Sequence, residues 1–111
     1  MTGYGVFSLE GRRALVTGSN SGLGFATARL LAEAGASVWI NGRDVAATQE
    51  AAARIAGATP LAFDVADEAA VEKAFATIKE AGGLDILVNN VGMRDRRGLQ
   101  DFTRQDVRRL I

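Results

Sequence analysis

A glycine-rich segment between an apolar run and an amphipathic stretch constrains the fold most strongly. The segment covers residues 17–24, Thr-Gly-Ser-Asn-Ser-Gly-Leu-Gly, and follows the run Ala14-Leu15-Val16. A short apolar run that stops at Thr-Gly indicates a buried strand. Apolar residues then recur at helical spacing, at Leu23, Ala26, Leu30, Leu31 and Ala34. Gly35 is a suitable stop for this helix, so the sequence predicts a strand, a glycine loop and a helix over residues 23–34.

The rest of the chain repeats this alternation of strand and helix. Further strands are predicted at residues 37–40, 61–63 and 85–88, and further helices at 45–56 and up to Glu80, with Asp44 and Asp67 as their caps. Strict alternation with short loops implies right-handed crossovers and a parallel sheet with helices on both faces. We therefore expect an α/β fold, a doubly wound Rossmann-type parallel sheet with strand order 3-2-1-4.

Composition excludes several classes of function. The 111 residues contain no Cys and no His, which removes thiolate and imidazole metal ligands and the catalytic pairs of Ser-His-Asp and Cys hydrolases. The absence of Cys and His therefore leads us to expect no metal site. Lys plus Arg and Asp plus Glu both number 13, so we also expect no nucleic-acid partner. The longest uncharged run, residues 14–28, is interrupted by glycine and polar residues. We therefore expect no membrane span, no signal peptide and a cytoplasmic location.

Each glycine of the loop has a physical reason. Gly18 permits a sharp exit from the strand, Gly22 lets the backbone approach a pyrophosphate, and Gly24 allows the helix to pack closely. The free amides at the start of the helix attract an anion, whereas no Gly-Lys-Ser/Thr ends the loop as in kinase-type phosphate loops. The loop residues predicted to bind a dinucleotide are Gly18, Ser19, Asn20, Ser21, Gly22, Leu23 and Gly24. The alternative is a glycine-rich turn without a ligand.

The end of the second predicted strand bears on which dinucleotide is bound. Dinucleotide folds place an acid near this point to bind the ribose 2′-hydroxyl of NAD. This chain has Asn41-Gly42-Arg43 instead, and a guanidinium can bind a 2′-phosphate in a bidentate manner. We therefore predict cofactor contacts at Asn41 and Arg43, with NADP(H) favoured over NAD(H). In the alternative interpretation, Arg43 is a solvated loop charge paired with Asp44.

These features together resemble the N-terminal part of a short-chain dehydrogenase/reductase, over residues 9–111. The segment 17–24 matches the family's Thr-Gly-x-x-x-Gly-x-Gly motif. Asp64-Val65 matches its adenine-contacting pair, and Asn-Asn-Val-Gly at 89–92 is similar to its Asn-Asn-Ala-Gly signature. The resemblance implies further cofactor contacts at Asp64, Val65, Asn90 and Gly92.

The resemblance also implies an activity. Members of the family transfer a hydride between a nicotinamide and an alcohol or carbonyl substrate. Residues 7–11 and the tip 41–43 look most like sugar-acid or polyol dehydrogenases of the gluconate 5-dehydrogenase kind. The family's catalytic Asn, Ser and Tyr-x-x-x-Lys lie downstream of a helix predicted to begin near Arg104, and Tyr4 is the only tyrosine. We therefore assign no catalytic residue and expect the 111-residue chain alone to be inactive.

Residues 1–111 are expected to be one NAD(P)-binding domain that ends before the catalytic segment. The full-length form is expected to be a homo-oligomer that acts on a small alcohol or carbonyl substrate. Two other interpretations stay open. The chain could be a non-catalytic dinucleotide-binding module, or a half-enzyme completed by a partner chain through strand addition.

Overall fold

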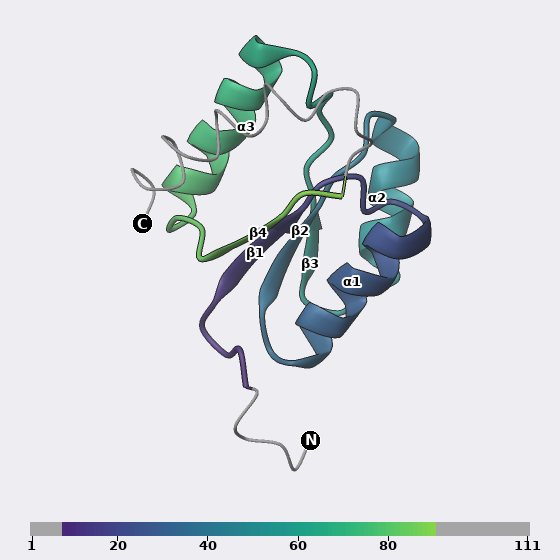
Figure 1. Cartoon of the computed structure of the whole chain (residues 1–111), viewed down its shortest axis with the longest axis vertical. Helices are drawn as coiled ribbons and strands as arrows, with labels where there is room; N and C mark the ends of the chain where they lie inside the picture. The colour runs from purple at the N-terminus through teal and green to yellow at the C-terminus, as the bar shows by residue number, and fades with distance from the viewer. Residues whose placement is uncertain (1–7, 91–111) are drawn as a thin grey trace.

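The computed structural model describes residues 8–90, and within this range four parallel strands form one sheet with three helices (Figure 1). The elements in chain order are β1 (Arg13–Val16), α1 (Gly22–Glu33), β2 (Ser37–Ile40), α2 (Val45–Ala53), β3 (Ala58–Pro60), α3 (Glu68–Glu80) and β4 (Ile86–Val88). The sheet has the order β3-β2-β1-β4. The fold class and strand order predicted from the alternation are confirmed.

The central strand β1 is buried on both faces. Ala14, Leu15 and Val16 are all 0% exposed, which explains why this strand has a continuous apolar run rather than an alternating pattern. Leu15 lies opposite Trp39 of β2 on one side and opposite Leu87 of β4 on the other. The site must therefore lie at an end of the sheet, because both faces of its centre are filled.

Two apolar clusters lie on opposite faces of the sheet. Figure 1 shows α1 and α2 on one face and α3 on the other. Ala14 and Val16 belong to the cluster that includes Ala28 of α1, whereas Leu15 belongs to the cluster that includes Ile78 of α3. The pleat of the strand sends successive side chains to opposite faces. This arrangement is the doubly wound architecture expected from the sequence.

The predicted caps of the second and third helices are confirmed. The Asp44 carboxylate accepts a hydrogen bond from the Ala47 amide at 2.8 Å, and that of Asp67 accepts one from the Ala70 amide at 3.2 Å. Helix α2 ends at Ala53, earlier than predicted, because the chain turns through Gly57, whose φ is +87°, to begin β3.

The third strand was predicted at residues 61–63, and this prediction is wrong. Strand β3 ends at Pro60, which lies opposite Ile40. The Leu61 amide still donates to the carbonyl of Ile40, the last residue of β2, and the Phe63 amide donates to the Gly42 carbonyl. The carbonyls of Leu61 and Phe63 accept instead from the Asn41 side chain. Beyond Pro60, the Asn41 side-chain amide thus takes the place of backbone donors to these two carbonyls.

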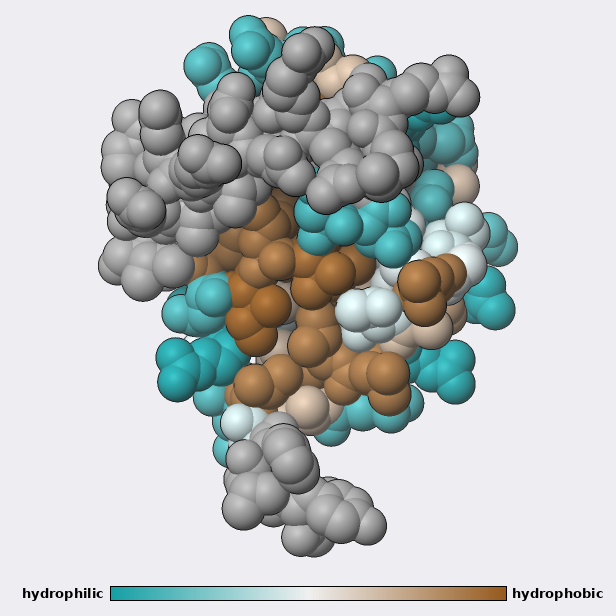
Figure 2. All heavy atoms as spheres, in the orientation of Figure 1, coloured by the Kyte–Doolittle hydropathy of each residue, from teal (hydrophilic) through white to brown (hydrophobic). Residues whose placement is uncertain are grey.

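The face of α1 that contacts the sheet also differs from the face suggested by its leucines. Leu23 and Leu30 are 74% and 66% exposed, whereas Gly24 and Ala28 are buried. Small residues at these positions let the helix lie close to the sheet, and this close approach turns both leucines outward. Figure 2 shows apolar side chains gathered on the face of the molecule that carries β1, β4 and α1.

Strand β4 pairs with β1, and within residues 8–90 no strand pairs with its other edge. Its three residues are half-buried. No helix in the described part of the chain is long and apolar enough to cross a membrane. The contact predicted at Gly92 and the helix predicted near Arg104 lie outside the described residues.

Candidate functional site

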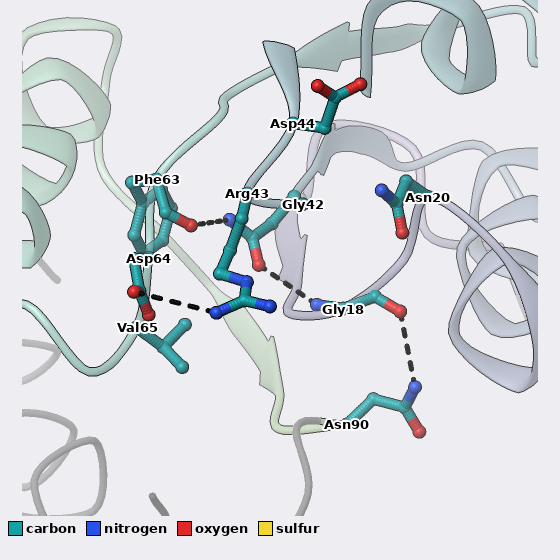
Figure 3. A pocket seen from close by; sticks show the side chains of 10 residues that line it. Gly18, Asn20, Gly42, Arg43, Asp44, Phe63, Asp64, Val65 and Asn90 are labelled. Atoms are coloured by element: carbon teal, nitrogen blue, oxygen red, sulfur yellow. Dashed lines mark hydrogen bonds and ion pairs between the residues drawn. The ribbon is translucent and has the colours of Figure 1, made fainter. Parts of the chain in front are cut away.

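A cavity of about 590 Å³ opens at the carboxyl ends of the strands (Figure 3). This is the end of an open α/β sheet at which ligands bind, and the volume is in the range of small-molecule sites. The loops after β1, β2 and β4 and the segment after β3 all contribute to it. Its lining residues are Gly18, Asn20, Asn41, Gly42, Arg43, Asp44, Phe63, Asp64, Val65 and Asn90.

The glycine loop has the geometry that its sequence predicts. Gly18 and Gly22 have φ values of +60° and +61°, a left-handed conformation in which glycine avoids the strain of a side chain. A Cβ on Gly24 would lie 2.7 Å from the Asn90 Nδ2 atom and would also collide with the Gly18 carbonyl. Close packing at Gly24 therefore joins α1 to its own loop and to the segment after β4.

Helix α1 begins beside this loop. Its N-cap, Ser21, is exposed and makes no side-chain capping bond. The first amides of a helix have no partner within the helix and carry partial positive charge. The loop can therefore present these amides to an anionic group such as a pyrophosphate.

The end of β2 is tied into the loop by buried polar groups. Asn41 is 2% exposed and Ser19 is 0% exposed. The Asn41 Oδ1 atom accepts from the Gly18 amide at 2.9 Å, and the Asn41 amide donates to Ser19 Oγ at 2.8 Å. Both side chains thus form internal contacts that shape the edge of the cavity.

Arg43 is the charged residue that extends across the cavity from the end of β2. Its side chain is 80% exposed, and Nη1 lies 3.9 Å from Oδ2 of Asp64. In Figure 3, Arg43 points toward Asp64 and Val65. The loop therefore places a guanidinium, rather than a carboxylate, at the tip of β2, which suits a phosphate ligand.

The segment after β4 closes the opposite side of the cavity. The Asn90 amide donates to Thr17 Oγ1 at 2.9 Å, and Asn90 Nδ2 donates to the Gly18 carbonyl at 3.4 Å. Thr17 is fully buried. These bonds hold the start of the Asn-Asn-Val-Gly signature against the glycine loop.

The predicted contact residues fall into three groups. The cavity lining includes Gly18, Asn20, Asn41, Arg43, Asp64, Val65 and Asn90. The remaining loop residues, Ser19, Ser21, Gly22, Leu23 and Gly24, lie in the same loop and in the first turn of α1 outside that lining. Gly92 is outside the described residues.

Sequence reasoning did not assign Gly42, Asp44 and Phe63 to the site, although they line the cavity. Asp44 was interpreted as a helix cap and, in the alternative, as the partner of Arg43, and Phe63 as part of a strand. Arg43 lies near Asp64 instead. Gly42 and Asp44 flank Arg43, and Phe63 directly precedes Asp64. This adjacency to predicted contact residues could have placed all three in the site. Among residues 8–90, no cluster of three or more acidic side chains could hold a metal ion.

Comparison with known proteins assigns the family. A model of the short chain dehydrogenase family matches residues 12–111. The chain belongs to the short-chain dehydrogenase family. Its relatives include the gluconate 5-dehydrogenase of Gluconobacter oxydans, 41% identical over 91% of this chain and 41% of that protein. The NADP-dependent (R)-specific alcohol dehydrogenase of Lentilactobacillus kefiri is 37% identical over 93% of this chain and 42% of that protein.

A solved structure shares the same arrangement. The crystal structure of a gluconate 5-dehydrogenase from Burkholderia cenocepacia in complex with NADP and tartrate matches this chain with a TM-score of 0.82 and 37% identity. The match covers 93% of this chain and 49% of that structure. The chain thus spans about two fifths to one half of the length of these similar proteins.

Proposed function

We propose that this chain binds NADP(H) as the cofactor-binding part of an oxidoreductase that transfers a hydride between the nicotinamide and an alcohol or carbonyl substrate. One observation carries the preference for NADP(H): Arg43 extends over the cavity beside Gly42, and positions 41 and 42 carry no carboxylate. The nearby Asp44 carboxylate caps α2. A carboxylate at position 41 or 42 would bind the 2′-hydroxyl of NAD and repel a 2′-phosphate.

The residues present fit a dinucleotide. The glycine loop and the first amides of α1 would hold the pyrophosphate, since Gly18 and Gly22 take the required left-handed conformation. Arg43 would bind the 2′-phosphate, and Asp64 with Val65 would contact the adenine. Asn90 would lie along the path to the nicotinamide, and we include Gly92 as a further contact because it completes the family's signature. The bound nicotinamide supplies the hydride chemistry, whereas these residues bind and orient it.

The substrate proposal rests on the relatives. We expect a sugar acid or a polyol, because a gluconate 5-dehydrogenase is among the similar proteins in both the sequence and the structure comparison. An NADP-dependent alcohol dehydrogenase among the relatives fits the broader class of alcohol and carbonyl substrates. The proposal includes a cytoplasmic location and a homo-oligomeric full-length form.

A second candidate function rests on the open edge of β4. In this alternative, the chain is a half-enzyme that a partner completes by adding a strand beside β4. The observation behind it is that β4 is apolar and that its pairing within residues 8–90 is with β1 alone. Titration with the purified chain by itself separates the two: cofactor binding without any partner supports the first function.

The test is to titrate the purified 111-residue chain with NADPH and with NADH and to follow the fluorescence of the reduced nicotinamide. We expect NADPH to bind at least tenfold more tightly, which corresponds to about 1.4 kcal/mol. Amide chemical shifts should change at residues 18–24, 41–43 and 64–65. Equal affinities for the two cofactors, or shift changes confined to the far end of the sheet, would contradict the proposal.

A further inference from the structure

The amide of Asn41 joins two segments that lie far apart in the sequence. Its Oδ1 atom accepts from the Gly18 amide at 2.9 Å. Its Nδ2 atom donates to the carbonyls of Leu61 and Phe63 at 3.2 and 3.1 Å. Both amide protons are therefore used, and one buried side chain links the glycine loop after β1 to the segment after β3.

The backbone of Asn41 adds a second connection to the same loop. The Ser19 amide donates to the Asn41 carbonyl at 2.7 Å, and the Asn41 amide donates to Ser19 Oγ at 2.8 Å. Ser19 Oγ itself donates to the Val16 carbonyl at 2.6 Å. Ser19 and Asn41 together form a buried hydrogen-bonded unit in which both side chains and both backbone amides have partners.

We infer that Asn41 is a positioning residue for the cofactor: its amide sets where the glycine loop lies relative to the segment that leads to Asp64. This inference rests on the proposed function. The pyrophosphate and adenine ends of a dinucleotide would contact these two segments, so their separation must match the ligand. A shift of the Gly18 amide would misplace the start of α1 relative to Arg43 and Asp64 and would weaken binding.

The chemistry of the position explains why an amide is needed. Asparagine offers one acceptor and two donors, and all three are required here. An aspartate would accept from Gly18, but it would direct a carboxylate oxygen at the Leu61 and Phe63 carbonyls, with no donor between them. A buried polar group without a partner is costly. Position 41 therefore excludes an acid.

The next position excludes an acid for a different reason. Gly42 is buried, and a Cβ there would lie 2.7 Å from Thr48 Oγ1 and would collide with the Asn20 side chain. Any side chain at 42 must displace these groups. Arg43 is thus the first side chain after β2 that reaches the open side of the cavity. Because positions 41 and 42 cannot hold the acid that would repel a 2′-phosphate, their packing supports a preference for NADP(H).

The first measurement needs no ligand. Amide hydrogen exchange of the 111-residue chain would compare Gly18 with Ala74, a buried residue of α3. In Asn41→Asp we expect the ratio of the Gly18 rate to the Ala74 rate to rise at least tenfold. Asn41→Ala removes the amide without introducing a charge and should give the same direction, which keeps the test valid if the aspartate variant does not fold. The control Thr77→Val, a change on the exposed side of α3, should leave this ratio unchanged.

The second measurement is NADPH affinity at a temperature where every variant is folded. We expect Asn41→Ala to bind NADPH at least tenfold more weakly than the wild type, and Thr77→Val to bind it equally well. An unchanged Gly18 ratio would overturn the positioning role. A faster Gly18 exchange with unchanged NADPH affinity would also overturn it, since the contact would then be structural only. A wild-type chain that binds no dinucleotide would instead overturn the proposed function.

Discussion

The guanidinium of Arg43 lies 3.9 Å from the carboxylate of Asp64, measured from Nη1 to Oδ2, across the mouth of the cavity. The two side chains are 80% and 43% exposed. An exposed pair at this separation contributes little to stability because water and salt screen it. Arg43 is therefore available to exchange this partner for a phosphate at small cost.

The first prediction concerns the stability of Arg43→Ala. Because the pair with Asp64 is exposed, we expect the free energy of unfolding to fall by less than about 1 kcal/mol. Urea denaturation of the wild type and the variant measures this difference. A loss several times larger would mean that Arg43 has a structural role, and its effect on binding could not then be assigned to the phosphate.

The second prediction concerns Gly24→Ala. The added methyl group would lie 2.7 Å from Asn90 Nδ2 and would collide with the Gly18 carbonyl, so the helix and the loop must separate. We expect a loss of about 1–3 kcal/mol in stability, together with weaker NADPH binding. The matched control is Ala26→Gly, on the exposed side of the same helix. Because glycine has a lower helix propensity than alanine, that change should lower the free energy of unfolding by about 1 kcal/mol. It should leave NADPH affinity unchanged. If Gly24→Ala binds as well as the wild type, the close contact is not needed.

The third prediction concerns Thr17→Val, which keeps the shape of the side chain and removes its hydroxyl. Thr17 Oγ1 accepts from the Asn90 amide at 2.9 Å in a fully buried position. We expect the free energy of unfolding to fall by about 1–3 kcal/mol, because the half-buried Asn90 amide would lose its acceptor. Thr77→Val provides the comparison, since Thr77 is exposed on α3 and should change stability by less than about 0.5 kcal/mol. Equal effects of the two changes would argue against a specific link at Thr17.

The fourth prediction concerns self-association. Strand β4 is apolar and pairs only with β1 within residues 8–90, and Leu23 and Leu30 of α1 are exposed. Apolar side chains gather on the face of the described chain that carries β4 (Figure 2). An unpaired strand edge with an apolar surface beside it favours pairing with another chain. In sedimentation velocity, we expect the average mass of the sedimenting species to increase with protein concentration. We expect this increase to be smaller for the double variant Leu23→Glu with Leu30→Glu. A sharp monomer at all concentrations would contradict this expectation.

The fifth prediction concerns turnover. The sequence has one tyrosine, Tyr4, and no lysine four residues after it, so it lacks the Tyr-x-x-x-Lys pair of the family. We expect the pure chain to bind NADPH but to oxidise it no faster than a Gly22→Trp variant in the presence of a keto-acid or keto-sugar. Turnover above that control would show that another group supplies the proton.

Local patterns in the sequence were sufficient to predict much of the fold. The alternation of strand and helix predicted the sheet order, and Asp44 and Asp67 marked two helix starts, because these features depend on neighbouring residues. The position of β3 was missed because the Leu61–Phe63 run is apolar, as a strand would be. The carbonyls of Leu61 and Phe63 instead accept hydrogen bonds from the side-chain amide of Asn41. A contact between residues this far apart in the sequence is not encoded in any local pattern.

The candidate site was predicted to a similar degree. Gly18, Gly22 and Arg43 follow from motif position, and the structure places Gly18 and Arg43 at the cavity with Gly22 at the start of α1. The orientation of α1 did not follow from its leucines. Its buried side is set by the close approach of Gly24 to the loop, which is a tertiary contact. The buried hydrogen bonds of Ser19 and Asn41 could not be predicted either, because the type of a polar residue does not specify which distant group it will bind.

The measurement that tests the central claim most directly is a cycle of four dissociation constants, those of NADPH and NADH for the wild type and for Arg43→Ala. Arg29→Ala is the control, because it removes the same charge from an exposed residue of α1 that pairs with Glu33. We predict that Arg43→Ala loses at least tenfold in NADPH affinity and little in NADH affinity, while Arg29→Ala keeps the wild-type ratio. A wild-type ratio retained in Arg43→Ala would contradict the assignment of Arg43 to the 2′-phosphate.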